Sequence, residues 1–282
     1  MKISRVKLLG VMMAALLVVG AAAGCSKSGQ EPESGKNASD LKGTITIAGS
    51  TSVQPLSEEL ASAFREKYPN VNINVAGGGS GAGIKAAQEG TAEIGASSRD
   101  LKSEEIGALN KTLIARDGIA VVVHPQNSVN ELTIEQARKI FAGEITNWKD
   151  VGGKSAAINL FTREEGSGTR DAFQEMVMGK DKKISSKAGV LNATGALRTA
   201  VAGDVNGIGY ISLGSLNKSV KALKIDGVEA TEATILDETY KIARPFLYLT
   251  KGEPEGIVKA YIDFVLSPEG QKIAAGKFIP VK

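Results

Sequence analysis

The stretch from Arg163 to Thr169 carries residue types that are suited to binding an anion. It reads Arg-Glu-Glu-Gly-Ser-Gly-Thr and is followed by apolar residues at helical spacing, so it predicts a polar turn that opens a helix. The start of a helix presents unpaired backbone N–H groups and a partial positive charge. Ser167 and Thr169 add hydroxyl donors, and the glycines allow the backbone to approach a ligand closely. Arg163 adds a fork of charged donors, although an ordinary capped helix without a ligand is the alternative.

Two further turns share this character. Thr51 and Ser52 follow an apolar, strand-like run and precede a helical pattern, and Ser80 occupies the same kind of place in the glycine-rich run 77–83. In parallel sheets, ligands bind at the carboxyl ends of the strands, where all three turns are expected to fall. Together the turns predict a site for a tetrahedral oxyanion, built largely from neutral donors.

The elements that would position these turns alternate between strands and helices from residue 43 onward. This rhythm predicts an α/β fold in which helices pack on mostly parallel sheets. Two apolar strands, at 119–123 and 246–250, bracket a middle segment of the chain. They predict two lobes that are joined by two hinge strands. The expected division is 43–123 for the first part of lobe 1, 124–242 for lobe 2 and 243–282 for the return segment of lobe 1.

The N-terminal segment has the pattern of an export signal. Residues 1–24 contain a basic start, a short apolar run and a series of small residues, which is typical of a signal peptide. Cys25, the single cysteine of the chain, follows directly and resembles the lipidated residue of a bacterial lipoprotein. Residues 25–42 are polar and predict a flexible tether. We therefore expect a lipid-anchored protein on the extracytoplasmic face of the cell membrane, either in a periplasm or on the outer cell surface.

The charge balance bears on the class of partner. The chain has 34 basic and 31 acidic residues, and three of the basic ones lie in the predicted signal peptide, which leaves 31 against 31. A nearly neutral body without a basic surface excess argues against nucleic acid as a partner. Any anion must then be held by local dipoles and a few charged groups.

Other chemistries are poorly supported by the sequence. The run 81–86 fits a loose dinucleotide-binding pattern, but a ribose-binding acid is not clearly placed at a later strand end, and the P-loop pattern fails. The only histidine is His124, beside a proline, and no Gly-x-Ser-x-Gly motif occurs. No metal-ligand spacing is found. We therefore expect no catalytic residues, no metal site and no cofactor, and hence a protein that is not an enzyme.

In combination, the motifs resemble those of the phosphate-binding lipoprotein of the bacterial high-affinity phosphate ABC transporter. The similarity runs from about residue 43 to the C-terminus. It implies the two-lobed periplasmic-binding-protein fold of type II, capture of inorganic phosphate between the lobes, and delivery to the permease subunits of an ABC transporter. The matching stretches are Ala48–Pro55, Gly77–Lys85, Ile94–Leu101, Ile140–Trp148 with Gly152, Arg163–Thr169 and Gly207–Tyr210.

The resemblance also implies which residues contact phosphate. These are Thr51, Ser52, Ser80, Ser98, Arg163, Ser167, Gly168 and Thr169.

Ser98 is a departure from the best-known branch of the family, which has a carboxylate at this place to accept the proton of hydrogen phosphate. A carboxylate favours protonated phosphate and repels sulfate, whereas a serine hydroxyl does not repel sulfate. Asp100 and Glu165 are alternative candidates for the proton acceptor. A receptor for another tetrahedral oxyanion such as sulfate, and a secreted phosphate-ester hydrolase on the same scaffold, therefore stay open as alternatives.

Overall fold

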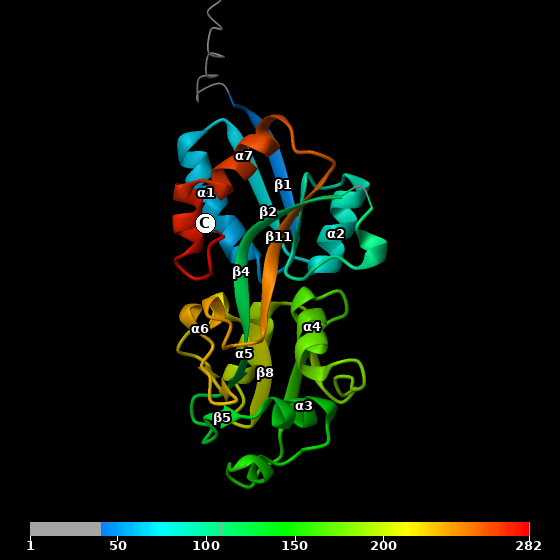
Figure 1. Cartoon of the computed structure of the whole chain (residues 1–282), viewed down its shortest axis with the longest axis vertical. Coiled ribbons are helices and arrows are strands. Elements are labelled where there is room, and N and C mark those ends of the chain that lie inside the picture. The colour runs from blue at the N-terminus through cyan, green and yellow to red at the C-terminus, as the bar shows by residue number, and fades with distance from the viewer. Residues whose placement is uncertain (1–40, 108, 282) are drawn as a thin grey trace, which may run out of the picture. The chain divides into compact units, whose positions relative to one another are not determined.

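The computed structural model describes residues 41–107 and 109–281 (Figure 1). The predicted signal peptide at 1–24, the predicted lipidation site Cys25 and nearly all of the tether at 25–42 lie outside the described residues. Among the helices that are described, none combines the length and the apolar character that crossing a bilayer requires.

The first group of elements is built around a short parallel sheet. β1 lies between β2 and β3 and pairs with both in parallel. The two C-terminal helices, α7 and α8, also belong to this group and pack near α1 (Figure 1). The elements are β1 (Gly43–Gly49), α1 (Gln54–Lys67), β2 (Val71–Ala76), α2 (Ser80–Glu89), β3 (Ile94–Ser97), the short 3-10 helix η2 (Ser103–Glu105), α7 (Gly256–Leu266) and α8 (Pro268–Ala274).

The second group is built around β8, which pairs in parallel with β6, while β6 pairs in parallel with β7. Its elements are β5 (Glu131–Leu132), α3 (Ile134–Ala142), the 3-10 helix η3 (Trp148–Val151), β6 (Asn159–Arg163), α4 (Gly168–Phe173), the π-helical turn η4 (Gln174–Met178), β7 (Gly189–Leu191), α5 (Thr194–Ala202), β8 (Gly207–Ser212), the 3-10 helix η5 (Leu213–Ser215), β9 (Lys221–Ala222), β10 (Lys224–Ile225) and α6 (Glu232–Leu236).

Two long strands connect the groups. β4 (Leu109–Val123) and β11 (Ala243–Lys251) pair antiparallel and lie side by side in Figure 1. β11 also pairs with β3 of the first group, and the last residues of β4 pair with β8 of the second. The resulting strand order is β2-β1-β3-β11-β4-β8-β6-β7. The predicted fold class, two α/β lobes joined by two hinge strands, is therefore confirmed.

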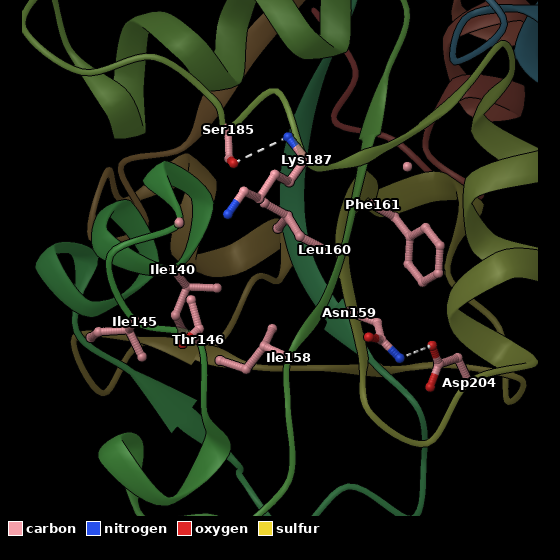
Figure 2. A pocket seen from close by; sticks show the side chains of 12 residues that line it. Ile140, Ile145, Thr146, Ile158, Asn159, Leu160, Phe161, Ser185, Lys187 and Asp204 are labelled. Atoms are coloured by element: carbon pink, nitrogen blue, oxygen red, sulfur yellow. Dashed lines mark hydrogen bonds between the residues drawn. The ribbon is translucent and has the colours of Figure 1, made fainter.

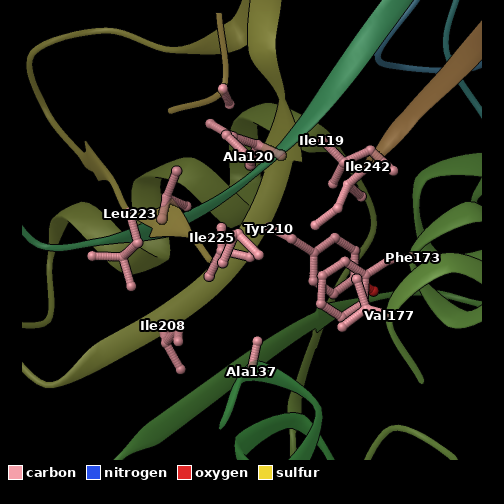
Figure 3. Packing of buried hydrophobic residues seen from close by; sticks show 14 of the residues in the cluster. Ile119, Ala120, Ala137, Phe173, Val177, Ile208, Tyr210, Leu223, Ile225 and Ile242 are labelled. Atoms are coloured by element: carbon pink, nitrogen blue, oxygen red, sulfur yellow. The ribbon is translucent and has the colours of Figure 1, made fainter. Parts of the chain in front are cut away.

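Each lobe has its own hydrophobic cluster. In the first lobe, Ile45, Phe64 and Tyr248 are fully buried in one cluster. The second-lobe cluster includes Phe173 and Tyr210, whose rings stack with a centroid distance of 4.1 Å (Figure 3). The apolar run 119–123, which the sequence analysis placed at the end of lobe 1, packs in this second cluster. The chain therefore changes from one core to the other within β4.

Candidate anion-binding site

Three turns of the first lobe meet at one edge of its sheet. β1, β2 and β3 run parallel, so the residues that follow them lie together. Ser50 follows β1, Ser80 begins α2, and Ser98 follows β3. The Ser98 backbone N–H donates to Ser80 Oγ at 3.0 Å, and the Ser50 hydroxyl donates to Ser98 Oγ at 2.8 Å. The parallel register thus joins three turns that are far apart in the sequence.

The turn from Arg163 to Thr169, which we call the organising turn of the second lobe, has the predicted form. Arg163 ends β6, and Ser167 is the N-cap of α4, where its Oγ accepts the backbone N–H of Arg170 at 3.3 Å. Gly166 has a φ of +82°, a backbone conformation that residues with a Cβ rarely adopt. Glycine at this position therefore lets the chain reverse between the strand and the helix.

Side chains of the two lobes meet directly. Arg163 donates from Nη1 to Thr194 Oγ1 at 2.9 Å and from Nη2 to Thr51 Oγ1 at 3.1 Å. Ser52 Oγ lies 2.9 Å from both Thr169 Oγ1 and Thr194 Oγ1. Two first-lobe hydroxyls are therefore in contact with one arginine and two hydroxyls of the second lobe.

The backbones also approach closely at this junction. The Gly81 N–H donates to the Gly166 carbonyl oxygen at 2.9 Å across the two lobes. A Cβ added to Gly168 would overlap the Ser80 hydroxyl and would lie 2.7 Å from Ser98 Oγ. The structure thus brings together all eight residues that the sequence predicted as phosphate contacts, which are Thr51, Ser52, Ser80, Ser98, Arg163, Ser167, Gly168 and Thr169.

The cluster is shielded from solvent and rich in donors. Arg163 is only 2% exposed, and seven hydroxyl-bearing residues beside it are buried: Ser50, Ser52, Ser80, Ser98, Ser167, Thr169 and Thr194. One edge of the Arg163 guanidinium pairs with the Glu164 carboxylate, at 2.8 Å from both Nε and Nη2. The remaining donors face the hydroxyls. A buried arginine among neutral hydroxyls is an arrangement that suits an anion with several oxygen atoms.

Two acidic residues that were predicted as alternative proton acceptors are not brought to this cluster. Asp100 and Glu165 are both exposed. The backbone turns after β3 through a bond from Ser97 Oγ to the Arg99 carbonyl at 2.9 Å, which leaves Asp100 on the outer side. Glu165 lines a separate surface hollow of about 660 Å³ because the chain reverses at the following Gly166.

Thr194 and Ser50 are members of the cluster that were not among the predicted phosphate contacts. Thr194 begins α5 three residues after the end of β7, and Ser50 directly follows β1. Both could have been suspected from the same signal as the other hydroxyls, a Ser or Thr between a strand and a helix. The turn before Thr194 lacks a run of glycines like the one around Ser80.

Arg99 and Asp171 link the lobes beside the cluster. Arg99, which is 6% exposed, donates to the two Glu105 oxygens at 2.6 and 2.8 Å. Its Nε also lies 2.8 Å from Asp171 Oδ2 of α4, an ion pair that is not aligned as a hydrogen bond. The hydrogen bond from Arg99 is the main reason why the pKa of Glu105 is lowered.

A second buried arginine, Arg244, stands behind Ser98 at the junction of the hinge strands. It faces Asp117 across the antiparallel pair of β11 and β4 and donates to Asp117 Oδ2 from Nε at 3.1 Å and from Nη2 at 2.9 Å. Ser212 of β8 donates to the other carboxylate oxygen at 2.8 Å. Burial raises the pKa of Asp117 and lowers the pKa of Arg244, while their mutual attraction opposes both shifts.

Two other features of the described residues, a cavity and the single histidine, do not include the predicted phosphate contacts. A cavity of about 400 Å³ lies in the second lobe beside α3 and β6, and its Asp204 carboxylate accepts a hydrogen bond from Asn159 at 2.7 Å (Figure 2). His124 Nδ1 accepts the backbone N–H of Gln126 in its own turn. In the part of the chain that the structure describes, no group of three or more His, Cys, Asp or Glu residues could hold a metal ion.

Comparisons with known proteins give consistent matches. A family model described as a PBP superfamily domain matches residues 31–269. The "Phosphate-binding protein PstS" of Bacillus subtilis is 32% identical over an alignment of 283 residues, which covers 96% of this chain and 92% of that protein. The protein of the same name from Borreliella burgdorferi is 31% identical over 247 residues, covering 83% and 88%.

Two solved structures are also similar to this chain. A putative phosphate ABC transporter substrate-binding protein with bound phosphate, from Clostridium perfringens, is 47% identical with a TM-score of 0.83, covering 85% of this chain and 100% of that one. An ABC-type phosphate transport receptor from Vibrio cholerae is 37% identical with a TM-score of 0.70, covering 84% and 100%.

Proposed function

Since the chain belongs to the PBP superfamily and, within it, to the family of phosphate-binding proteins PstS, as its motifs predicted, we propose that it captures inorganic phosphate between its two lobes and delivers it to the permease of an ABC transporter. The permease would recognise the form in which the lobes have closed on the anion. The protein is then a receptor that leaves its ligand chemically unchanged.

The observation that carries this proposal is the environment of Arg163. Its guanidinium is almost completely buried, donates to hydroxyls of both lobes and has one carboxylate partner, Glu164, whose side chain is 23% exposed. A buried charge needs partners that compensate the loss of water, and an oxyanion would supply them. The proposed ligands of phosphate are Arg163 for charge and Thr51, Ser52, Ser80, Ser98, Ser167, Gly168, Thr169 and Thr194 for further hydrogen bonds.

The division of the chain into lobes is part of the proposal. The predicted division places residues 43–123 and 243–282 in lobe 1 and residues 124–242 in lobe 2. Because residues 119–123 pack in the second cluster, we propose that the boundary in β4 lies before residue 119. The two separate hydrophobic clusters support two rigid bodies. Because the core changes within β4, we place the flexing point in the part of β4 and β11 that contains Asp117 and Arg244.

The attachment to the membrane is proposed from the sequence pattern. Residues 1–24 would be removed, Cys25 would carry the lipid, and residues 25–42 would tether the body on the extracytoplasmic side of the membrane. In cells that express Cys25→Ser, the protein should move from the membrane fraction to the soluble extracytoplasmic fraction. Retention in the membrane fraction would contradict the lipid anchor.

The binding function is tested by calorimetric titration of the unlipidated chain that begins after Cys25. Phosphate should bind with a stoichiometry of one. Equal binding of sulfate would leave the fold and site in place but would replace phosphate by tetrahedral oxyanions in general. Release of phosphate from a phosphate ester would favour the hydrolase alternative, and binding of neither anion would contradict the receptor function.

A further inference from the structure

Ser98 occupies a special place between the two lobes. It is fully buried at the end of β3, and its Oγ faces Gly168 of the organising turn, where an added Cβ would come within 2.7 Å. Its hydroxyl also lies 3.3 Å from Ser80 Oγ. Ser98 is therefore beside the proposed phosphate ligands, and the direction of its hydrogen bonds decides what it can offer to an anion.

The first bond that Ser98 accepts comes from Ser50. A hydroxyl oxygen can accept two hydrogen bonds and donate one. Ser50 Oγ accepts the backbone N–H groups of Ser52 and Val53 at 3.2 and 3.4 Å. Its own hydrogen is therefore free to be donated, and it is donated to Ser98 Oγ at 2.8 Å. The Ser50 hydroxyl thus occupies one of the two acceptor positions of Ser98 Oγ.

The second bond comes from Arg244, whose Nη1 donates to Ser98 Oγ at 3.2 Å and to the Ser98 carbonyl oxygen at 3.2 Å. A guanidinium has no acceptor, so the direction of this bond is certain. Arg244 is held in place by Asp117, and the side chains of both residues are 0% exposed. With both acceptor positions occupied, the Ser98 hydroxyl can only donate. In this structure its hydrogen is left with Ser80 Oγ at 3.3 Å, a long hydrogen bond that a bound anion would replace.

We propose that Ser98 contacts the anion as a hydrogen-bond donor only, and that Arg244, anchored by Asp117, is the positioning residue that keeps it in this role. This inference rests on the proposed function. Ser98 then strengthens the binding of any tetrahedral oxyanion and does not accept the proton of hydrogen phosphate. Selectivity between phosphate and sulfate must come from other groups.

The test of the donor role is Ser98→Ala, measured as the affinity for phosphate and for sulfate by calorimetry. Loss of one donor to an anion should weaken both by a similar factor, about 10- to 100-fold. The ratio of the two affinities, or the exclusion of sulfate if the unaltered protein shows it, should stay unchanged. If Ser98→Ala weakens phosphate alone, Ser98 is an acceptor and the proposal is overturned. Failure of the unaltered protein to bind either anion would instead contradict the proposed function.

The test of the positioning role is the double variant Asp117→Leu/Arg244→Met. It removes both buried charges together, so neither is left unpaired. One acceptor position on Ser98 becomes free, and the affinity ratio should shift toward phosphate. A purely structural role would weaken both anions equally, and an unchanged ratio would therefore overturn the assignment of Arg244.

Two further variants make this second test secure. Adding Ser98→Ala to the double variant should abolish the shift in the affinity ratio, because the shift acts through the Ser98 hydroxyl. If circular dichroism shows that the double variant is unfolded, Arg244→Lys replaces it. Lysine keeps a positive charge for Asp117 but lacks the fork that reaches both Asp117 and Ser98. The same shift toward phosphate is expected, and its absence again contradicts the proposal.

Discussion

Arg163 and Arg244 are both almost completely buried, yet their surroundings differ. Arg163 donates to neutral hydroxyls of both lobes, and its carboxylate partner is partly open to solvent. Arg244 donates to a carboxylate that is itself completely buried. Burial alone therefore does not identify an anion-binding arginine. The charge of Arg244 is neutralised within the fold, whereas the charge of Arg163 is directed at groups that a ligand could join.

Removing the two arginines should have different main effects, and removing Arg244 should mainly lower the stability of the fold. Arg244→Met leaves the Asp117 carboxylate buried without a charged partner, which should lower the free energy of unfolding by about 3–5 kcal/mol. Asp117→Leu/Arg244→Met should recover most of this loss. Urea denaturation of both variants checks the prediction. Equal destabilisation of the single and double variants would show that Arg244 acts mainly through packing.

Arg163→Ala should affect binding more than stability. It removes charged hydrogen bonds, each worth about 1.5–3 kcal/mol, and phosphate affinity should fall by about 100-fold or more. Arg163→Lys keeps the charge without the fork and should give an intermediate loss. Ser80→Ala, which removes one neutral hydroxyl, should lose less. Calorimetric titration ranks the three variants, and a larger loss for Ser80→Ala than for Arg163→Ala would reverse the comparison.

The close approach of the lobes around Arg163 is tested by Gly168→Ala. The added methyl group would overlap the Ser80 hydroxyl, and such overpacking typically costs about 1–3 kcal/mol. Since it acts only when the lobes are together, phosphate affinity should fall by about 10- to 100-fold with little change in melting temperature. Gly195→Ala is the matched control because a Cβ there would meet nothing within 4 Å. An unchanged affinity for Gly168→Ala would mean that the lobes bind phosphate at a wider separation.

A third arginine, Arg99, extends the comparison to pH. It holds the pKa of Glu105 below its ordinary value of about 4.3, so the pair contributes stability that is fully present above that pH and is lost as the pH falls through the folded pKa. Glu105→Gln should therefore lower the free energy of unfolding at neutral pH by about 0.5–1.5 kcal/mol, and the difference should vanish in acid. Thermal melts between pH 3 and 7 measure this difference.

The control for the pH effect is Asp263→Asn, which removes an exposed ion pair with Lys259. Exposed pairs contribute little, so its melting curve should follow that of the unaltered protein at every pH. If Glu105→Gln is still less stable than the unaltered protein at pH 3, the loss of stability comes from lost packing and not from a lost charge.

The local pattern of the chain was sufficient to predict the organising turn and the two hydroxyl turns of the first lobe. The stretch predicted a polar turn that opens a helix, and Ser167 is the N-cap of that helix while Arg163 lies at the end of a strand. These features depend on neighbours within a few residues, and the alternation of strands and helices then places the turns at one edge of the sheets. The family followed from the same motifs in combination.

The partners of these residues were decided only by the tertiary structure. Arg244 meets Asp117 across 127 residues because of the register between β4 and β11, which shifts at a bulge between Phe246 and Leu247. A shift of one residue in a strand turns a side chain to the opposite face, so no local pattern could reveal this pair. The same holds for Thr194, 143 residues from Thr51, and for the exposure of Asp100 and Glu165. Local periodicity determines which residues form turns, whereas long-range register determines which residues form hydrogen bonds with one another.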